Sequence, residues 1–313
     1  MSFSQFVDSI EREAYSSRIF DTPCLFGRDI TEFRDFVMTW YGADLELGHP
    51  EDTKHQKLPR IVYPLDYMSN LDPVQKQLID DFVKDLESSL GVQKTEISFA
   101  ERWTNSAPEN LAGQSLQQFM EHAPTHAFFY DHYHNFHEFR TKYHAKFGKA
   151  PYVSPTLRWR WEIAKDLTRS QREESILRLQ TFKRWFLDEV MCVPTHTTMV
   201  VLPIEAMRPN YRDDPPSPPQ MPMGIGMLDL APTLGAPELV VPIGQISYDS
   251  RVSGQIEYLP VTLSLMGAPG TDLDLIGEAR VCLEKAGRPT RVRVGSSMFA
   301  KEAGDKTQVE DEK

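Results

Sequence analysis

The sequence predicts an α/β protein in which a mixed sheet is flanked by helices. One observation is the run over residues 231–283, where two β-branched segments are followed by a turn and an amphipathic helix. Another is the alternation of strand, helix and strand over residues 58–99, which is typical of a βαβ unit with parallel strands. Gly, Pro or Asp marks each boundary in both runs, which indicates separate elements.

The C-terminal run is predicted to be an irregular hairpin followed by a helix. Its strands are residues 239–241 and 260–266, and residues 249–254 form a polar connection between them. Gly267 marks the turn after the second strand, and Asp272 is the expected N-cap of the helix. The apolar residues of this helix recur at helical spacing and are expected to face the core: Leu273, Leu275, Ile276, Ala279 and Leu283.

The clearest helix lies between strands predicted at residues 58–64 and 95–99. Asp72 is its expected N-cap, Pro73 occupies its first turn and Gly91 is placed to end it. Its apolar stripe consists of Val74, Leu78, Ile79, Phe82, Val83, Leu86 and Leu90. Burying such a stripe contributes about 1.5–3 kcal/mol per large side chain before conformational entropy is subtracted.

Two further helices are predicted from capping boxes. Asp29 and Glu32 begin the first helix, and Gly42 ends it. Ser170 and Glu173 begin the second. The apolar face of the first carries Ile30, Phe33, Phe36, Val37 and Trp40. The apolar face of the second carries Ile176, Leu179, Phe182, Phe186 and Val190. After them, residues 288–294 are expected to form a final short strand or an extended end.

Composition excludes several classes of protein. The chain has 313 residues, a formal net charge of −11 and no basic stripe, which argues against binding to nucleic acid. No apolar run approaches the roughly 20 residues that span a bilayer, and residues 1–18 do not resemble a signal peptide. Three cysteines, far apart in the sequence, fit a reducing compartment and provide no thiolate metal site. We therefore expect a cytoplasmic globular protein with no membrane segment, metal or cofactor.

Several of these motifs resemble the amidase-signature family of amide hydrolases. The segments GAPELVVPIG and LPVTLSLMGAPGTDLDLIGEA are similar to the C-terminal section of that family. The matching positions are Gly235, Pro237, Pro242, Gly244, Leu259, Pro260 and Gly267. Thr262 and Ser264 replace the family's usual Gly and Gln in the second strand. The turn at residues 20–23 resembles a family segment that lies just downstream of the catalytic region.

The resemblance implies a truncated version of the family's large α/β/α sandwich. The family hydrolyses amides with a Ser–Ser–Lys triad, in which a neutral lysine serves as base and Gly/Ser-rich loops hold the oxyanion. Residues 1–19 contain no Lys and no Gly, and we interpret Ser16 and Ser17 as ordinary capping or loop serines. The resemblance therefore assigns no catalytic residue to this chain. It divides the chain into an extension (1–19), an amidase-like domain (20–299) and a disordered polar tail (300–313).

The segment over residues 103–150 is helical in composition and rich in aromatic residues and histidine. Its histidines are His122, His126, His132, His134, His137 and His144. We favour half-buried aromatic packing with surface histidines over a ligand-facing wall or a metal site, because Pro124 interrupts the His122–His126 spacing and no Cys or HExxH motif accompanies them. Residues 158–161 read Arg-Trp-Arg-Trp, either a cation–π stripe or a helix that extends its arginines into solvent.

Two segments near the middle of the chain carry further motifs, one similar to the family and one rich in proline. Residues 191–195 resemble the family's strand end near its site, which would place His196 in a loop after a strand. A loop histidine without a nearby nucleophile seldom performs chemistry. Residues 203–222 contain seven prolines and are predicted to be a stiff loop or lid. A Pro-x-x-Pro ligand for a partner domain is the alternative, but strong flanking basic residues are lacking.

Three functional hypotheses follow from the sequence. The chain is a non-catalytic amidase-like protein that acts as a binding or partner subunit. Alternatively, it is the C-terminal part of an amide hydrolase whose catalytic half is encoded separately or missing from the gene model. In the third hypothesis it is a remnant without stable activity. A truncated sheet would expose an unpaired edge, which a protein partner would complete. A small amide is the expected ligand class, but the sequence assigns no substrate-binding residue.

Overall fold

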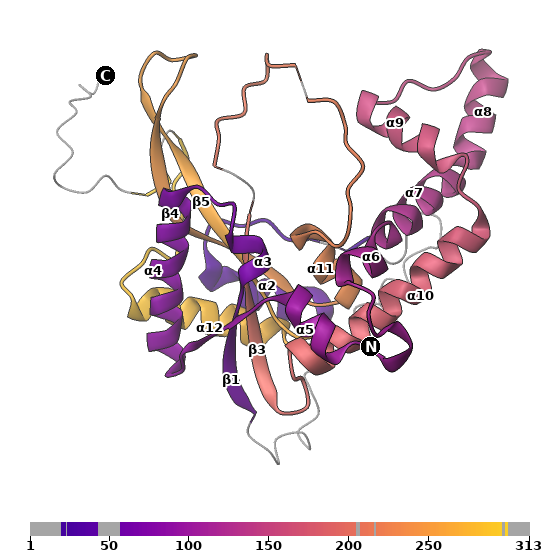
Figure 1. Cartoon of the computed structure of the whole chain (residues 1–313). Coiled ribbons are helices and arrows are strands. Elements are labelled where there is room, and N and C mark those ends of the chain that lie inside the picture. Colours follow the sequence, from indigo (N-terminus) through magenta and orange to yellow (C-terminus); the bar gives the residue numbers. More distant parts are fainter. Residues whose placement is uncertain are drawn as a thin grey trace.

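The computed structural model describes residues 20–22, 24–42, 57–204, 207–215, 217–295 and 298–299. The predicted extension (1–19) and tail (300–313) lie outside these residues, and the division into three parts stays a prediction. Figure 1 shows a sheet with helices on both faces and a helical projection at one side. The sheet has five strands: β1 (Leu58–Pro64), β2 (Lys94–Ile97), β3 (His196–Pro203), β4 (Glu238–Asp249) and β5 (Ile256–Met266).

The sheet is mixed, as predicted. Its strand order is β2-β1-β3-β5-β4. The first three strands run parallel, and β5 runs antiparallel to both β3 and β4. In the described part of the chain, β2 and β4 form the two edges of this sheet. The α/β class with a mixed sheet, expected from the sequence, is therefore confirmed, and the strand order adds what periodicity did not predict.

Helices cover both faces of the sheet and fill two cores. On one face lie α2 (Phe33–Tyr41), α4 (Pro73–Leu90) and α12 (Asp272–Lys285). On the other lie α5 (Phe99–Ser106), α6 (Leu116–Met120), α10 (Arg169–Trp185), the π-turn η5 (Phe186–Val190) and α11 (Met227–Leu234). Short helical turns occur at η1 (Ile30–Glu32), α3 (Leu65–Met68) and η4 (Glu109–Leu111). Strand side chains alternate between the cores: Ile61 and Tyr63 face the first, and Val62 faces the second.

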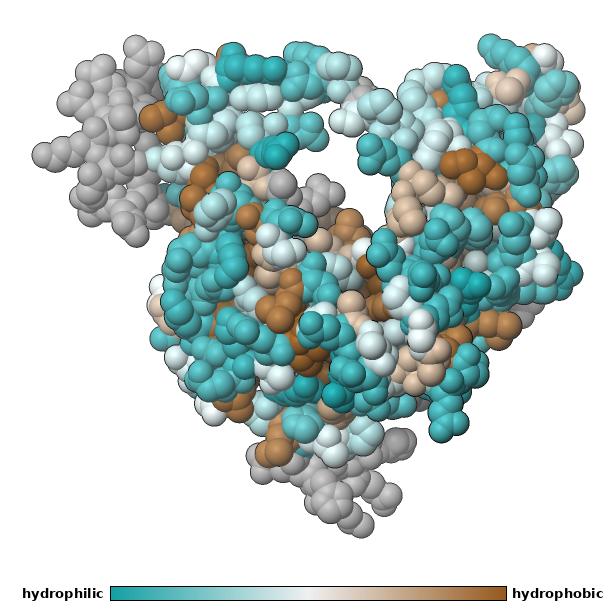
Figure 2. All heavy atoms as spheres, viewed as in Figure 1, coloured by the Kyte–Doolittle hydropathy of each residue, from teal (hydrophilic) through white to brown (hydrophobic). Residues whose placement is uncertain are grey.

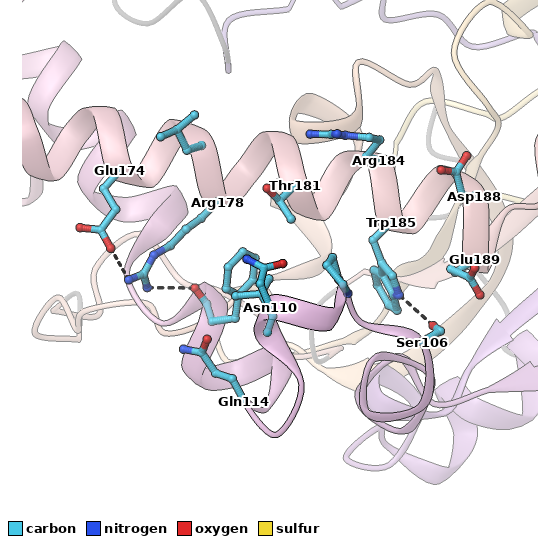
Figure 3. A pocket seen from close by; sticks show the side chains of 14 residues that line it. Ser106, Asn110, Gln114, Glu174, Arg178, Thr181, Arg184, Trp185, Asp188 and Glu189 are labelled. Carbon is cyan, nitrogen blue, oxygen red and sulfur yellow. Dashed lines mark hydrogen bonds and ion pairs between the residues drawn. The ribbon is translucent and has the colours of Figure 1, made fainter.

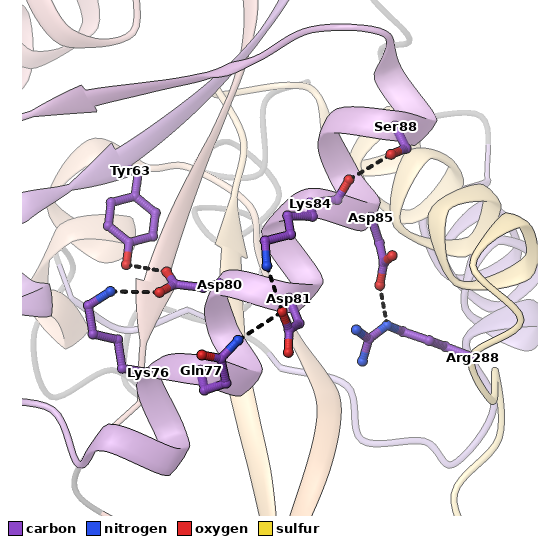
Figure 4. Close-up of polar contacts among 9 residues, drawn as sticks. All are labelled: Tyr63, Lys76, Gln77, Asp80, Asp81, Lys84, Asp85, Ser88 and Arg288. Carbon is purple, nitrogen blue, oxygen red and sulfur yellow. Dashed lines mark hydrogen bonds and ion pairs between the residues drawn. The ribbon is translucent and has the colours of Figure 1, made fainter.

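The β1–α4–β2 unit forms as predicted, except that Val74 of the expected apolar stripe lies in the first turn of α4 and is 53% exposed. The Asp72 carboxylate accepts the Val74 amide at 2.9 Å, and Gly91 ends α4 in the left-handed conformation with φ of 70°. The Tyr63 hydroxyl donates to Asp80 at 2.7 Å, and Lys76 Nζ lies 2.6 Å from the other oxygen of the same carboxylate (Figure 4). Farther along α4, Asp85 binds Arg288, which follows α12 and also donates to the carbonyl of Ile243. The contact therefore joins α4 to β4 and to the segment after α12.

The C-terminal hairpin is longer than predicted. β4 and β5 pair from Glu238–Met266 to Asp249–Ile256, with a register shift between Pro242 and Gly244. A Cβ at Gly244 would lie 3.0 Å from methyl carbons of Leu78, so glycine lets α4 approach the strand. All five predicted core residues of α12 are buried. Its N-cap is Thr271 rather than Asp272, which is the first helical residue.

Other sequence predictions need correction. Helix α10 is capped two residues earlier than expected, by a capping box of Thr168 and Gln171 instead of Ser170 and Glu173. Residues 191–195 form a turn before β3 and not the end of a strand, so His196 begins a strand instead of following one. The strand predicted over residues 95–99 ends at Ile97, because Ser98 caps α5. Of the two alternatives predicted for residues 288–294, the short strand is wrong, and the segment instead makes an isolated bridge between Asp29 and Arg291, which fits an extended end.

The apolar face predicted for the helix that includes α2 is only partly buried. Ile30, Phe33 and Val37 pack on the core, whereas Phe36 and Trp40 are 46% and 43% exposed. Asp29 caps this segment as expected, although its carboxylate accepts the Thr31 amide and not that of Glu32. The predicted end at Gly42 is confirmed, since Gly42 is the C-cap with φ of 53°.

Three helices form a projection that we call the arm (residues 123–164). They are α7 (Ala123–Asn135), α8 (His137–Phe147) and α9 (Pro155–Ala164). The described parts of the proline-rich loop, residues 207–215 and 217–222, contain no helix or strand, in agreement with the prediction. In Figure 2 an opening is visible between this loop, the arm and the rest of the molecule.

Candidate functional site

A groove of about 620 Å³ runs along α10 on the helical side of the molecule (Figure 3). One wall is the segment that joins α5 to α6, and the other is the outer face of α10 continued by η5. The first wall consists of Ser106, Pro108, Asn110, Leu111, Gln114 and Phe119. The second consists of Glu174, Leu177, Arg178, Thr181, Arg184, Trp185, Asp188 and Glu189. This volume lies within the range of about 300–1,000 Å³ that small-ligand sites occupy.

The first wall is held by local capping and by one buried indole. Ser115 and Gln118 form a capping box that fixes the start of α6. Trp103 donates its indole N–H to the Gln114 carbonyl at 2.9 Å and stacks on Phe119 with ring centroids 4.9 Å apart. Because Trp103 is fully buried, this contact fixes the backbone of the connection against the second core.

The second wall is joined to the first by two polar contacts. Trp185 donates its indole N–H to the Ser106 hydroxyl at 2.9 Å (Figure 3). Arg178 donates to the Phe119 carbonyl at 3.1 Å and also pairs with Glu174. At the far end of the groove, Arg102 binds Glu189 at 2.9 Å. The two walls are therefore preorganised, because side chains of α10 and η5 bind residues of α5 and α6.

The groove combines an apolar lining with separated polar groups. Leu111, Phe119 and Trp185 supply apolar surface, whereas Asn110, Gln114 and Thr181 supply amide and hydroxyl groups. Arg184 and Asp188 also line it, and neither has an ion-pair partner among the described residues. Such a lining can hold a small planar group and exchange hydrogen bonds with an amide, whose N–H donates and whose carbonyl accepts.

A second polar region lies at the carboxyl ends of the parallel strands, the edge where open α/β sheets bind ligands. There Tyr67 donates to the Ile225 carbonyl at 3.0 Å, and Gln75 donates to the Ile204 carbonyl at 3.0 Å. These bonds attach the segments at the two ends of the proline-rich loop to α3 and α4. Burial raises the pKa of the Tyr67 phenol above its ordinary range, so this hydroxyl stays protonated and donates. These residues hold the loop in place.

Serines near the two regions make structural hydrogen bonds. Ser106 accepts the Trp185 indole, and Ser98 caps α5 while donating to Asp66 at 2.9 Å. Ser264, which stands where the resembled family has Gln, donates to Glu238.

Lys183 on α10 is half-buried, and burial lowers its pKa. Its Nζ lies 3.2 Å from the position that a Cβ at Gly235 would take, and no hydrogen bond joins it to a serine among the described residues.

The histidines singled out in the sequence are distributed through the arm and do not form a metal centre in the described part of the chain. His122 and His126 stack with centroids 4.9 Å apart, and Pro124 lies in the first turn of α7. His132 accepts the Trp161 indole at 3.3 Å. His196 Nδ1 lies 2.8 Å from the Thr195 hydroxyl at the start of β3. Ser16 and Ser17 lie outside the described residues.

The sequence did not identify the groove. Leu177, Arg178, Thr181 and Arg184 on α10 and Asp188 on η5 recur at helical spacing, so their common face was available as a signal. A polar face on a helix usually contacts water, and nothing in the sequence places the α5–α6 connection opposite it. At residues 158–161, Arg160 lies 5.6 Å from the Phe128 ring, Arg140 packs on Trp161 at 4.8 Å and Arg158 is exposed. The cation–π contacts therefore join the motif to other residues of the arm.

The fold resembles that of amidases. A crystal structure of an amidase matches with a TM-score of 0.55 and 15% sequence identity, over 82% of this chain and 51% of that one. A bacterial aryl acylamidase of the amidase-signature family matches with a TM-score of 0.47 and 17% identity, over 75% and 47% of the two chains. The allophanate hydrolase of Kluyveromyces lactis matches with a TM-score of 0.47 and 13% identity, over 76% and 33%.

This likeness to an amidase fold agrees with the resemblance drawn from the sequence motifs, and the chain spans about half the length of the amidase it matches (51%). At 15% sequence identity, the likeness shows an amidase-like fold and does not show an activity or a substrate. The sequence matches no family model. No helix in the described part of the chain has the length and apolar character required to span a bilayer.

Proposed function

We propose that this protein is a non-catalytic binding protein with an amidase-like fold, which holds a small amide in the groove along α10. The observation that carries the proposal is the groove itself: two preorganised walls, an apolar lining of Leu111, Phe119 and Trp185, and amide and hydroxyl groups from Asn110 and Thr181. Such a lining would stack against the apolar part of the ligand while the polar groups exchange hydrogen bonds with its amide.

Two further observations support a role in binding instead of hydrolysis. The groove serine, Ser106, already accepts the Trp185 indole, so it does not resemble a nucleophile activated by an adjacent base. The half-buried Lys183 lies beside the turn at Gly235 and has no hydrogen bond to a serine among the described residues. We also propose a cytoplasmic location, which is supported by three cysteines that are free thiols in the structure.

The test uses the full chain with acetanilide as a simple aryl amide and a fluorophosphonate probe that labels active serines. We expect saturable binding of acetanilide, followed by Trp fluorescence or calorimetry, without release of aniline and without labelling. Thr181→Trp should fill the groove and reduce binding at least about tenfold, the equivalent of 1.4 kcal/mol. Ser170→Trp, on an exposed turn of the same helix, is the matched control. Labelling of a serine, or binding that survives Thr181→Trp, would contradict the proposal.

The second candidate is the C-terminal part of an amide hydrolase whose catalytic residues another chain or a longer product supplies. The coverage of 51% of an amidase favours it, and so does the sheet, which ends in edge strands β2 and β4 within the described residues. A protein partner would then complete the sheet. Mapping of the native transcript together with the intact mass of the native protein separates the two candidates. A longer product or a co-purifying chain that restores fluorophosphonate labelling would establish the second.

A further inference from the structure

The arm has a charge opposite to that of the rest of the chain. Residues 123–164 contain six basic side chains and three acidic ones, whereas the whole chain has a formal net charge of −11. The basic residues are Arg140, Lys142, Lys146, Lys149, Arg158 and Arg160, and the acidic ones are Asp131, Glu138 and Glu162. The arm therefore has a formal charge of +3, and the remaining residues have −14. Such an asymmetry attracts the arm to acidic surfaces.

Helix α8 presents an unpartnered aromatic face at the end of the arm. None of its residues is buried. Phe136, Phe139, Tyr143 and Phe147 recur at helical spacing, and their ring centroids follow one another at 6.5, 5.9 and 4.6 Å. Phe139 and Phe147 are 48% and 52% exposed. We call these four rings with Lys146 and Lys142, which pairs with Glu138 on the same helix, the α8 face. Figure 2 shows hydrophobic residues exposed among hydrophilic ones on the arm.

A complementary surface lies on the other side of the molecule, at α2 and the first turns of α12. Phe36 and Trp40 are exposed there, with ring centroids 5.3 Å apart. Asp272, Asp274 and Glu278 follow on α12, and none of the three has an ion-pair partner among the described residues. Helices α2 and α12 pack against each other, and burial, with the nearby charge of Asp272, raises the pKa of Tyr41 at the end of α2. We call Phe36, Trp40 and these carboxylates the α2–α12 face.

The two faces match in chemistry, since one combines exposed aromatic rings with lysines and the other combines exposed aromatic rings with carboxylates. They cannot meet within one molecule, because Figure 1 shows α8 at the tip of the arm and α2 and α12 behind the sheet on the body. Contact of one α8 face with another would bring like charges together, which is unfavourable. We propose that the α8 face of one copy docks on the α2–α12 face of a second copy. This contact is head-to-tail, so it generates rings or open chains.

The salt dependence of self-association is the first test. Exposed charges more than a Debye length apart are screened, and that length falls from about 10 Å at 0.1 M salt to about 3 Å at 1 M. Sedimentation velocity of the full chain should show a concentration-dependent assembly in the lower salt that weakens at least tenfold in the higher, about 1.4 kcal/mol. A chain that stays monomeric in the lower salt up to the highest concentration at which it remains soluble would overturn the proposal.

A charge-swap pair identifies the two faces. Lys142→Glu with Lys146→Glu reverses the α8 face, and Asp274→Lys with Glu278→Lys reverses the α2–α12 face. Each double variant alone should associate at least about tenfold more weakly than the wild type, while an equimolar mixture should recover association, because the reversed charges are again opposite. Asp274→Lys alone serves if the double variant unfolds. Arg208→Glu with Arg212→Glu, exposed in the proline-rich loop, controls for net charge and should leave association unchanged.

Failure of the mixture to recover would overturn the assignment of the two faces. Binding of anionic lipid vesicles by a chain that remains monomeric would also overturn it, and would assign the α8 face to a membrane surface. Neither readout involves the groove along α10, so this inference and the proposed amide binding succeed or fail separately.

Discussion

Asp131 on α7 accepts two hydrogen bonds from the guanidinium of Arg172 on α10, at 2.6 and 3.1 Å. The Asp131 side chain is 9% exposed, so this bidentate pair lies within the interface between the arm and the body. The hydrogen bond to Asp131, against an opposing effect of burial, raises the pKa of Arg172, so the guanidinium stays charged at neutral pH. The pair fixes the direction in which the arm leaves the body.

Arg172→Met should loosen the arm. The substitution leaves Asp131 without its guanidinium partner and should lower the free energy of unfolding by about 1.5–3 kcal/mol, the range for hydrogen bonds to charged groups. Urea denaturation measures this loss, and hydrogen exchange should show faster exchange in α7. Arg169→Met removes an exposed pair with Glu173 on the same helix and should change stability by less than about 0.5 kcal/mol. Equal effects of the two substitutions would show that Asp131–Arg172 does not anchor the arm.

Mild acid should destabilise the arm through its histidines. Burial lowers the pKa of His126, His132 and His134 below the ordinary value of 6.5. The charges of Arg160 and Arg140 lower the pKa of His132 further, whereas the charge of Asp21 raises it. Because the unfolded chain takes up these protons more readily, stability is highest above pH 6.5 and declines as pH falls below it. Protonation of His132 Nδ1 also removes the acceptor of the Trp161 indole.

The measurement for this pH effect is hydrogen exchange of α7 and α9, compared between neutral and mildly acidic solution. His132→Gln keeps a side-chain acceptor near Trp161 but removes one titrating group, so it should reduce the acid effect. An arm that exchanges equally at both pH values would contradict the prediction.

Ser106→Ala should open the groove at its Trp185 end. Loss of the hydroxyl leaves the indole N–H of Trp185, a residue only 4% exposed, without its acceptor. The expected cost is about 1–3 kcal/mol of unfolding free energy. A shift in the emission of Trp185, isolated by replacing the other tryptophans with Phe, reports the change in its surroundings. Ser106→Thr retains a hydroxyl and should restore most of the stability.

Tyr63→Phe should weaken the contact between β1 and α4. Burial and the hydrogen bond to Asp80 raise the pKa of Tyr63 to about 12, and Lys94 Nζ lies 4.0 Å from its ring centroid. The substitution keeps the ring and removes the hydroxyl, so a loss of about 0.5–1.5 kcal/mol is expected. Spectrophotometric titration should show one tyrosine fewer ionising near pH 12 in the variant. If the set of late-ionising tyrosines is unchanged, the assignment to Tyr63 is wrong.

The sequence predicted the elements that depend on nearby residues. Asp72, Pro73 and Gly91 specify the ends of α4 because each acts on backbone groups within one turn. Strand β3 was missed because its buried residues form a continuous apolar run without alternation, the pattern of a strand covered on both faces. Helix α11 was missed because Pro232 lies inside it, where proline ordinarily argues against a helix.

By itself, the sequence determined the α/β class, the β1–α4–β2 unit, the core face of α12 and the resemblance to amidases. Only the tertiary structure decided the strand order, the wall that faces α10 across the groove, and the exposure of α8 and of Phe36 and Trp40. The physical reason is the range of the interactions involved. Caps and helical stripes follow from contacts within a few residues, whereas a groove or an exposed face depends on where distant segments come to lie.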